Sequence, residues 1–172
     1  MIHLEEITII EAPIERCFDL ARSVEVHLAG NVHFGEQAIA KSGVTAGLID
    51  LHQRVTWRAK HFGISQNLTS EITAMESPIY FQDTMIRGAF RSMQHDHHFR
   101  ALPSSATEMK DVFRFAAPLP LLGRIAEIIV LRRYMRNLLH ERNAVIKQIA
   151  ESESNDWQHY LPTQSIPKVS QP

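Results

Sequence analysis

The longest periodic segment of the chain, residues 122–151, constrains the fold most strongly. Apolar side chains recur there at helical spacing along one stripe, and charged side chains such as Arg133, Arg136 and Lys147 occupy the opposite side. A helix of about thirty residues is roughly 45 Å long, which is enough to cross a small domain. The rest of the chain must therefore provide a large apolar surface for this helix to cover.

The middle of the chain can provide that surface as a β-sheet. Apolar and polar residues alternate between turn signals over six stretches, residues 35–41, 50–60, 64–75, 79–90, 92–102 and 107–117. Residues 2–10 predict a strand before them, and Pro13 opens the first of two short helices. The order predicts an α+β domain in which a curved, seven-stranded antiparallel sheet wraps around the C-terminal helix. Such an arrangement can leave a cavity between sheet and helix.

Length and charge narrow the class of protein. A chain of 172 residues is most simply one domain, and we expect it over residues 1–151, followed by a polar, loosely ordered tail over residues 152–172. The formal net charge of −1 gives no reason to expect nucleic acid as a partner. Cys17 is the only cysteine and cannot form an internal disulfide.

We expect a cytoplasmic protein without a transmembrane segment. The N-terminal residues are acidic where a signal peptide would be basic, and they lack a long apolar core. The most apolar later stretch, residues 116–131, is interrupted by Pro118, Pro120, Arg124 and Glu127. The sequence also lacks a Gly-rich phosphate loop, a GxSxG motif and a CxxC pair, which argues against nucleotide-dependent enzymes, α/β-hydrolases and thiol redox proteins.

Residues 1–151 resemble the START-related, helix-grip (SRPBCC) superfamily, more narrowly a bacterial branch of it. The resemblance rests on the element order and on the segments APIERCFDLA, VTWRAKHFGISQNLTSEIT, FQDTMIRGAFRSMQHDHHF and YMRNLLHERNAVIKQIAE. That superfamily includes polyketide cyclases and aromatases, lipid-transfer proteins and pollen-allergen-like carriers. The resemblance implies a helix-grip fold with a cavity for a hydrophobic ligand. It carries no catalytic residue over by position, because the superfamily has no invariant catalytic set.

The segment MQHDHHF, residues 93–99, holds three histidines, and strand alternation divides them between two faces. One face is bounded by apolar side chains, which places it toward the cavity: Met93, His95, His97 and Phe99. The other face is polar and is expected to meet solvent: Gln94, Asp96, His98 and Arg100. Two histidines, rather than a cluster of three, are therefore predicted to face the interior.

Asp111 on the following strand can pair with His95 or His97 across the hairpin, and three uses of these residues stay open. The pair can fix the strands or orient a ligand, because buried polar groups need partners whether or not they react. It can act as a general acid and base, with the carboxylate setting the imidazole tautomer. The same residues can ligate zinc, but two histidines and one carboxylate fall short of a diagnostic spacing, so we predict no metal and no other cofactor.

The remaining predicted site residues complete an apolar pocket. Asp83 and Arg87 share one face of their strand, and the alternation does not decide whether that face points inward. Trp57 is expected to form a large apolar wall. The predicted ligand-binding set combines apolar walls with a few polar groups: Trp57, Asp83, Met85, Met93, His95, His97, Phe99, Asp111 and Phe113.

The function expected from this set is binding or transport of a hydrophobic small molecule, such as a lipid, a polyketide or an isoprenoid-like compound. One alternative is an enzyme of the cyclase/aromatase or dehydratase type that uses a His–Asp pair, with His95, His97 and Asp111 as the candidate catalytic residues. Another is a protein-interaction module that docks through its basic helix or an exposed strand edge.

Overall fold

The computed structural model describes residues 1–32, 35–39, 43–61, 63–116 and 124–161. Within these ranges one antiparallel sheet has seven strands in the spatial order β1-β7-β6-β5-β4-β3-β2. The strands are β1 (Ile2–Ile10), β2 (Gln37–Ala38), β3 (Arg54–His61), β4 (Ile64–Glu76), β5 (Tyr80–Arg87), β6 (Ser92–Ala101) and β7 (Thr107–Ala116). The helices are α1 (Ile14–Ala21), α2 (Val24–Gly30), α3 (Arg124–Ala150) and the 3-10 helix η2 (Asp156–Tyr160).

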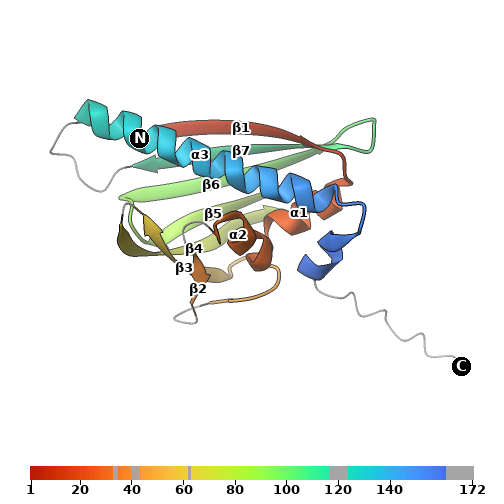
Figure 1. The fold of residues 1–172 in the computed structure, drawn as a ribbon, viewed down its shortest axis with the longest axis horizontal. Helices are drawn as coiled ribbons and strands as arrows, with labels where there is room; N and C mark the ends of the chain where they lie inside the picture. The colour runs from red at the N-terminus through yellow and green to blue at the C-terminus, as the bar shows by residue number, and fades with distance from the viewer. Residues whose placement is uncertain (33–34, 40–42, 62, 117–123, 162–172) are drawn as a thin grey trace, which may run out of the picture.

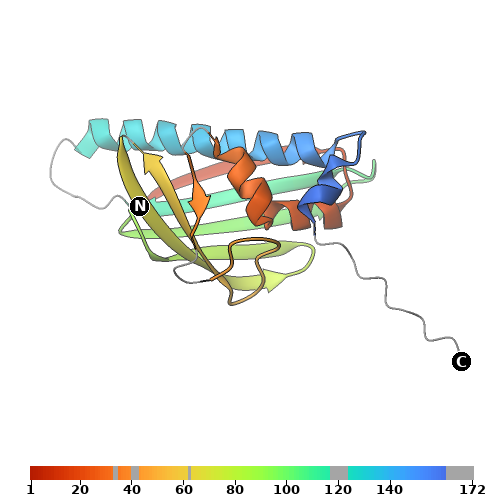
Figure 2. The ribbon, with the colours of Figure 1, turned by 60° about the horizontal axis from the view of Figure 1, so that its bottom comes forward.

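The helix α3 lies across one face of the sheet, and the strands curve around that side of the molecule (Figures 1 and 2). The helices α1 and α2 follow β1 in the chain and lie on the same side as α3 (Figure 2). This arrangement confirms the predicted α+β class, the seven antiparallel strands, the two short helices and the long terminal helix. No helix among the residues described in the structure is long and apolar enough to cross a membrane.

Local sequence explains where the short helices begin. Pro13 precedes the first turn of α1, where the missing N–H of a proline breaks no helical hydrogen bond. The apolar face of α1 carries Cys17 and Phe18 into the core. Ser23 caps α2, because its hydroxyl oxygen accepts a hydrogen bond from the backbone N–H of Val26 at 3.4 Å.

Two groups of buried side chains join the helices to the sheet. The larger group packs α1 and α3 onto the middle strands through residues such as Phe18, Phe81, Phe99, Met109 and Ile146. The second group lies against another stretch of α3 and includes Leu4, Met93, Phe113, Phe115 and Leu139. Because both groups lie between the sheet and α3, the predicted role of the long helix as the cover of the sheet is correct.

Two apolar side chains at the beginning of the alternating stretches 50–60 and 64–75 are exposed. Leu51 lies in the turn before β3 begins, so the alternation of that strand does not extend to it. Ile64 pairs with His61 at the end of the β3–β4 hairpin. Alternation in sequence therefore located these strands but overestimated how far along them the covered face extends.

The chain beyond α3 returns to the domain as η2. The side chains of Trp157, Tyr160 and Leu161 pack against the larger core group, and the Arg16 guanidinium lies 4.2 Å from the centre of the Trp157 ring. The Ser23 hydroxyl donates a hydrogen bond to the Tyr160 carbonyl at 3.0 Å. Residues 156–161, which belong to the segment expected as a tail, thus contact α1 and α2. Residues 162–172 of that segment lie outside the described residues.

Candidate functional site

A cavity of about 470 Å³ lies between α3, the two short helices and the concave face of the sheet. Most of its lining is apolar, and the large side chains include Trp57, Phe81, Met93, Phe113, Met135 and Leu139. The polar lining includes Asp83, His95 and Arg142. The side chains of the middle strands and of α3 thus enclose an apolar space that has ionisable groups in its wall.

Four ionisable side chains form one cluster beside this cavity, which we call the His–Asp cluster: Asp83, His95, His97 and Asp111. They come from three adjacent strands. Asp83 on β5 is directly opposite His95 on β6, and His97 on β6 is directly opposite Asp111 on β7. All four point to the same face, because residues two apart on a strand share a face and directly paired residues share it too.

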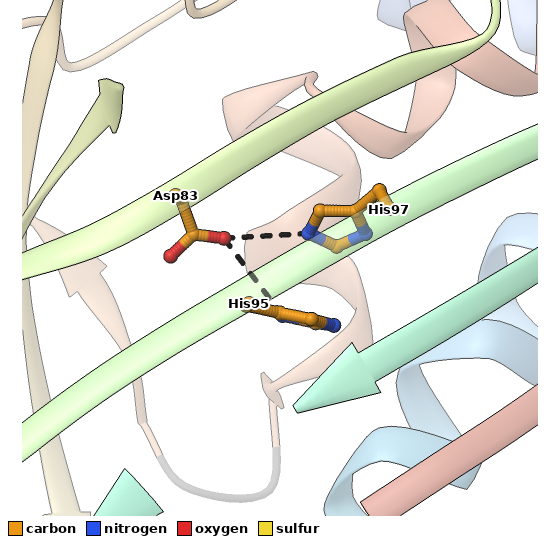
Figure 3. Close-up of side chains that lie close together, drawn as sticks. All are labelled: Asp83, His95 and His97. Carbon is orange, nitrogen blue, oxygen red and sulfur yellow. Dashed lines mark hydrogen bonds and ion pairs between the residues drawn. The ribbon is translucent and has the colours of Figure 1, made fainter. Parts of the chain in front are cut away.

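Each imidazole of the cluster lies between the two carboxylates. Asp111 Oδ1 is 2.9 Å from His95 Nε2 and 2.7 Å from His97 Nδ1. Asp83 Oδ2 lies on the other side of both rings, 3.3 Å from His97 Nε2 and 3.8 Å from His95 Nδ1 (Figure 3). His97 Nδ1 makes no hydrogen bond despite its short distance to Asp111, whereas His97 Nε2 is hydrogen-bonded to Asp83 Oδ2.

Asp111 is held in place within the cluster by its surroundings. Its carboxylate is buried, and its second oxygen accepts a hydrogen bond from Asn143 Nδ2 at 2.7 Å. The same amide nitrogen lies 3.3 Å from the Thr8 hydroxyl, so Asn143 connects α3 with β7 and β1. Neighbouring aromatic rings hold the imidazoles. Phe81 stacks on His97 with centroids 4.1 Å apart, and Phe113 meets His95 edge-on at 5.0 Å.

Burial and the contacts within the cluster shift the pKa values of His95, Asp111 and Asp83. Burial and the neighbouring His97 lower the pKa of His95 to about 4, so its ring is neutral at pH 7. Burial alone would raise the pKa of Asp111, but His97 and His95 hold it well below its usual value. In Asp83, too, the effect of burial is outweighed by the two histidines, and the pKa is lowered. Both carboxylates are therefore ionised at neutral pH.

The structure places the predicted site residues in two groups. Five border the cavity, namely Trp57, Asp83, Met93, His95 and Phe113. The other four are Met85, His97, Phe99 and Asp111, which are not among the lining residues. His97 and Asp111 contact His95 within the cluster, Phe99 packs against Phe18 in the larger core group, and Met85 packs at the edge of the second group. The face of β5 that the sequence left open is also settled, because Asp83 points inward whereas Arg87 is exposed.

The prediction that Asp96 meets solvent is wrong. Asp96 does lie on the outer face of the sheet, but only 5% of its surface is exposed. Its carboxylate accepts hydrogen bonds from the Tyr80 hydroxyl at 2.8 Å and from Gln82 Nε2 at 2.7 Å, and it forms an ion pair with Arg114. Long side chains from both neighbouring strands thus cover a charge that alternation alone assigns to the surface. His98 is exposed, as predicted.

Sequence reasoning missed the contributions of the helices to the site. Asn143 lies at helical spacing between Leu139 and Ile146, so a polar residue in the buried stripe was the available signal. Arg142 lines the cavity and donates a hydrogen bond to the Ala21 carbonyl at 3.0 Å. His27 of α2 stacks on Trp57 at 3.9 Å between ring centres and lies 3.2 Å from Glu36. No local pattern pointed to His27, because its contact depends on how α2 packs against β3.

Comparisons with known proteins identify solved structures that share the fold of this chain. No family model and no curated protein sequence matches the chain. A START superfamily protein from Mycobacterium smegmatis matches with a TM-score of 0.66 at 10% identity, over 87% of this chain and 97% of that one. Ginseng major latex-like protein 151 from Panax ginseng matches with a TM-score of 0.58 at 13% identity, over 93% of this chain and 97% of that one.

A third solved structure is the di-domain ARO/CYC StfQ from the steffimycin biosynthetic pathway. It matches with a TM-score of 0.58 at 15% identity, over 88% of this chain and 46% of the larger protein. Identities this low bear on the fold alone. The sheet order, the covering helix and these three likenesses together show that the chain has the helix-grip fold of START-related proteins.

Proposed function

We propose that the chain binds a hydrophobic small molecule, such as a lipid, a polyketide or an isoprenoid-like compound, in the cavity between the sheet and α3. The observation that carries the proposal is an interior space of about 470 Å³ with mainly apolar walls. Pockets for small organic molecules have volumes of about 300–1,000 Å³ and combine apolar walls with a few polar groups. A space of this kind buries most of the surface of an apolar ligand, which is the main source of its affinity.

The polar lining gives the proposed ligand an orientation. Asp83 and His95 line the cavity from adjacent strands, and Arg142 lines it from α3. A guanidinium has five N–H donors, and the bond to Ala21 leaves donors that can meet an oxygen of the ligand. The ligand we propose is therefore amphipathic, with an apolar body along Trp57 and Phe113 and one oxygen-bearing end toward Asp83, His95 and Arg142.

A displacement assay tests this proposal. An environment-sensitive fluorescent probe is bound to the wild-type chain, and fatty acids, isoprenoid alcohols and polycyclic phenols then compete for the site. The variant Ala59→Leu adds bulk at a buried position in the cavity wall, and Lys60→Leu adds a similar side chain at the exposed neighbouring position on β3. Overpacking costs about 1–3 kcal/mol, so we expect Ala59→Leu to weaken binding by about 5–150-fold.

The control variant should bind as the wild type does, with far-UV circular dichroism showing that both variants are folded. Equal binding by wild type and Ala59→Leu would contradict the proposal. The absence of any competing compound among the three classes would also count against it.

A further inference from the structure

Three electron-pair donors converge at one point of the His–Asp cluster. Asp83 Oδ2 is 3.3 Å from His97 Nε2 and 3.8 Å from His95 Nδ1, and Figure 3 shows the carboxylate facing both rings. One ligand atom from each of these residues lies within 4.8 Å of the other two. Among the residues that the structure describes, no other group of three or more histidine, cysteine or acidic side chains meets in this way.

Asp111 lies on the opposite side of the two rings. Asp111 Oδ1 is 2.9 Å from His95 Nε2 and 2.7 Å from His97 Nδ1. Of these two contacts, the one with His95 has hydrogen-bond geometry, so we assign a proton to His95 Nε2 and a lone pair to His95 Nδ1, which lies toward Asp83. His97 Nε2 is hydrogen-bonded to Asp83 Oδ2 at 3.3 Å, and a metal ion can replace the proton that these two atoms share.

We propose that Asp83 Oδ2, His95 Nδ1 and His97 Nε2 bind one divalent transition-metal ion of the zinc type, and that Asp111 holds both rings from behind. Two imidazoles and one carboxylate are a donor set that zinc uses in sites with an open position. Ligating histidines commonly donate their other N–H to a carboxylate, which fixes the tautomer and the ring orientation. Here Asp111 makes this contact with His95 and lies 2.7 Å from His97 Nδ1, and Asn143 fixes Asp111 in turn.

The spacing of the donors fits such an ion. Zinc bonds to nitrogen and to carboxylate oxygen are about 2.0–2.2 Å long, which places tetrahedral ligands about 3.3 Å apart. The distance from Asp83 Oδ2 to His97 Nε2 is 3.3 Å, and the distance to His95 Nδ1 is 3.8 Å. Asp83 is the most exposed of the donors, because 19% of its side chain is exposed while His95 and His97 are buried. A small rotation of this carboxylate would bring the second distance into range.

The fourth position of the proposed ion would face the cavity, because Asp83 and His95 both line it. Arg142 lines the same space, and its positive charge favours an anionic oxygen, such as hydroxide or a carboxylate, as the fourth ligand. The proposed ion does not depend on the hydrophobic ligand, because all three of its protein ligands belong to the chain itself. The proposed metal site differs from the sequence-based prediction. That prediction was of no metal, and the zinc site it considered had Asp111, rather than Asp83, as the third ligand.

Metal titration of the untagged chain tests the proposal. The protein is treated with a chelator, dialysed and titrated with Zn²⁺ by calorimetry, and with Co²⁺ by visible absorption. We expect one ion per chain and the intense absorption bands of tetrahedral Co²⁺ with nitrogen and oxygen ligands. Neither measurement requires a hydrophobic ligand. Conversely, the probe-displacement assay can be run with chelator present, so failure of one proposal is separable from failure of the other.

Substitutions identify the ligands. Asp83→Asn changes a partly exposed group with little change of shape, and we expect it to abolish the tetrahedral Co²⁺ spectrum, as His97→Gln should. Asp111→Asn should weaken Zn²⁺ binding by about 10–100-fold while the spectrum persists at high Co²⁺. His98→Gln is the matched control, because His98 is exposed on the opposite face of the same strand. It should bind as the wild type does.

The absence of stoichiometric Zn²⁺ binding by the folded wild-type chain would overturn the proposal. An unchanged Co²⁺ spectrum in folded Asp83→Asn, or an equal loss in His98→Gln, would overturn it as well. Far-UV circular dichroism identifies any variant that has not folded. The titration of the wild-type chain tests Zn²⁺ binding without the variants.

Discussion

At the scale of single residues, Asn143 holds the polar part of the site together. It is buried in the apolar stripe of α3 and donates a hydrogen bond to Asp111, which in turn lies against both histidines. A carboxylate in a buried site is stable only when its lone pairs are met by donors. This residue therefore contributes to the geometry of the cluster although it is not among the residues that line the cavity.

The substitution Asn143→Ala should lower the free energy of unfolding by about 2–3 kcal/mol, because it removes the donor for a buried, charged oxygen. The measurement is urea denaturation followed by circular dichroism. Asn137→Ala is the control, since Asn137 lies on the exposed side of the same helix and its loss should change stability by less than about 0.5 kcal/mol. Equal stability of the two variants would show that Asn143 does not support Asp111.

Asp96 on the outer face should make the stability of the chain depend on pH. Burial alone would raise the pKa of this carboxyl, but hydrogen bonds from Gln82, Tyr80 and Arg114 lower it to about 2. Because the pKa is lower in the folded than in the unfolded chain, its contribution is present above about pH 4 and is lost as the pH falls toward 2. Asp96→Asn should therefore reduce the free energy of unfolding by about 1–3 kcal/mol at pH 7.

The difference in unfolding free energy between wild type and Asp96→Asn should shrink as the pH falls from 4 toward 2, because the wild-type carboxyl then takes up a proton. Glu153→Gln, at an exposed position between α3 and η2, should show no comparable dependence. A difference that stays constant over this range would contradict the assigned role of the Asp96 charge.

At the scale of elements, alternation and helical periodicity predicted more of the fold than any single motif did. The seven strands and the long helix follow from patterns that each strand and helix carries locally. The inward face of β5 could not be predicted, because its pairing with β4 shifts register near Thr69 and again near Ile72. The cover over Asp96 depends on side chains from β5 and β7, and the alternation of β6 does not show that these side chains reach over its outer face.

The helix α3 stabilises the fold through its buried stripe. Ile146 is 1% exposed within the larger core group, whereas Ile129 near the start of the same helix is 60% exposed. Ile146→Ala should lower the unfolding free energy by about 2–5 kcal/mol, because it removes buried methyl groups and leaves a cavity. Ile129→Ala is the matched control and should cost less than about 1 kcal/mol by thermal or urea denaturation. Similar losses in the two variants would mean that the assigned face of α3 is wrong.

At the scale of the whole molecule, the sheet and α3 enclose an interior that is only partly filled. Residues of both core groups border a space of about 470 Å³. Because protein interiors are close-packed as a rule, a space of this size supports the ligand site that we propose. Asp83 and His95 place the His–Asp cluster in the wall of this space, where Glu36 and Gln66 are further polar lining residues.

A crystal structure of the chain with its tightest-binding compound from the displacement panel tests the central claim most directly. We expect electron density for the compound between the sheet and α3, with its apolar part against Trp57 and Phe113 and an oxygen within hydrogen-bonding distance of His95, Asp83 or Arg142. Density for the compound only on the outer surface, with the interior closed around rearranged side chains, would contradict it.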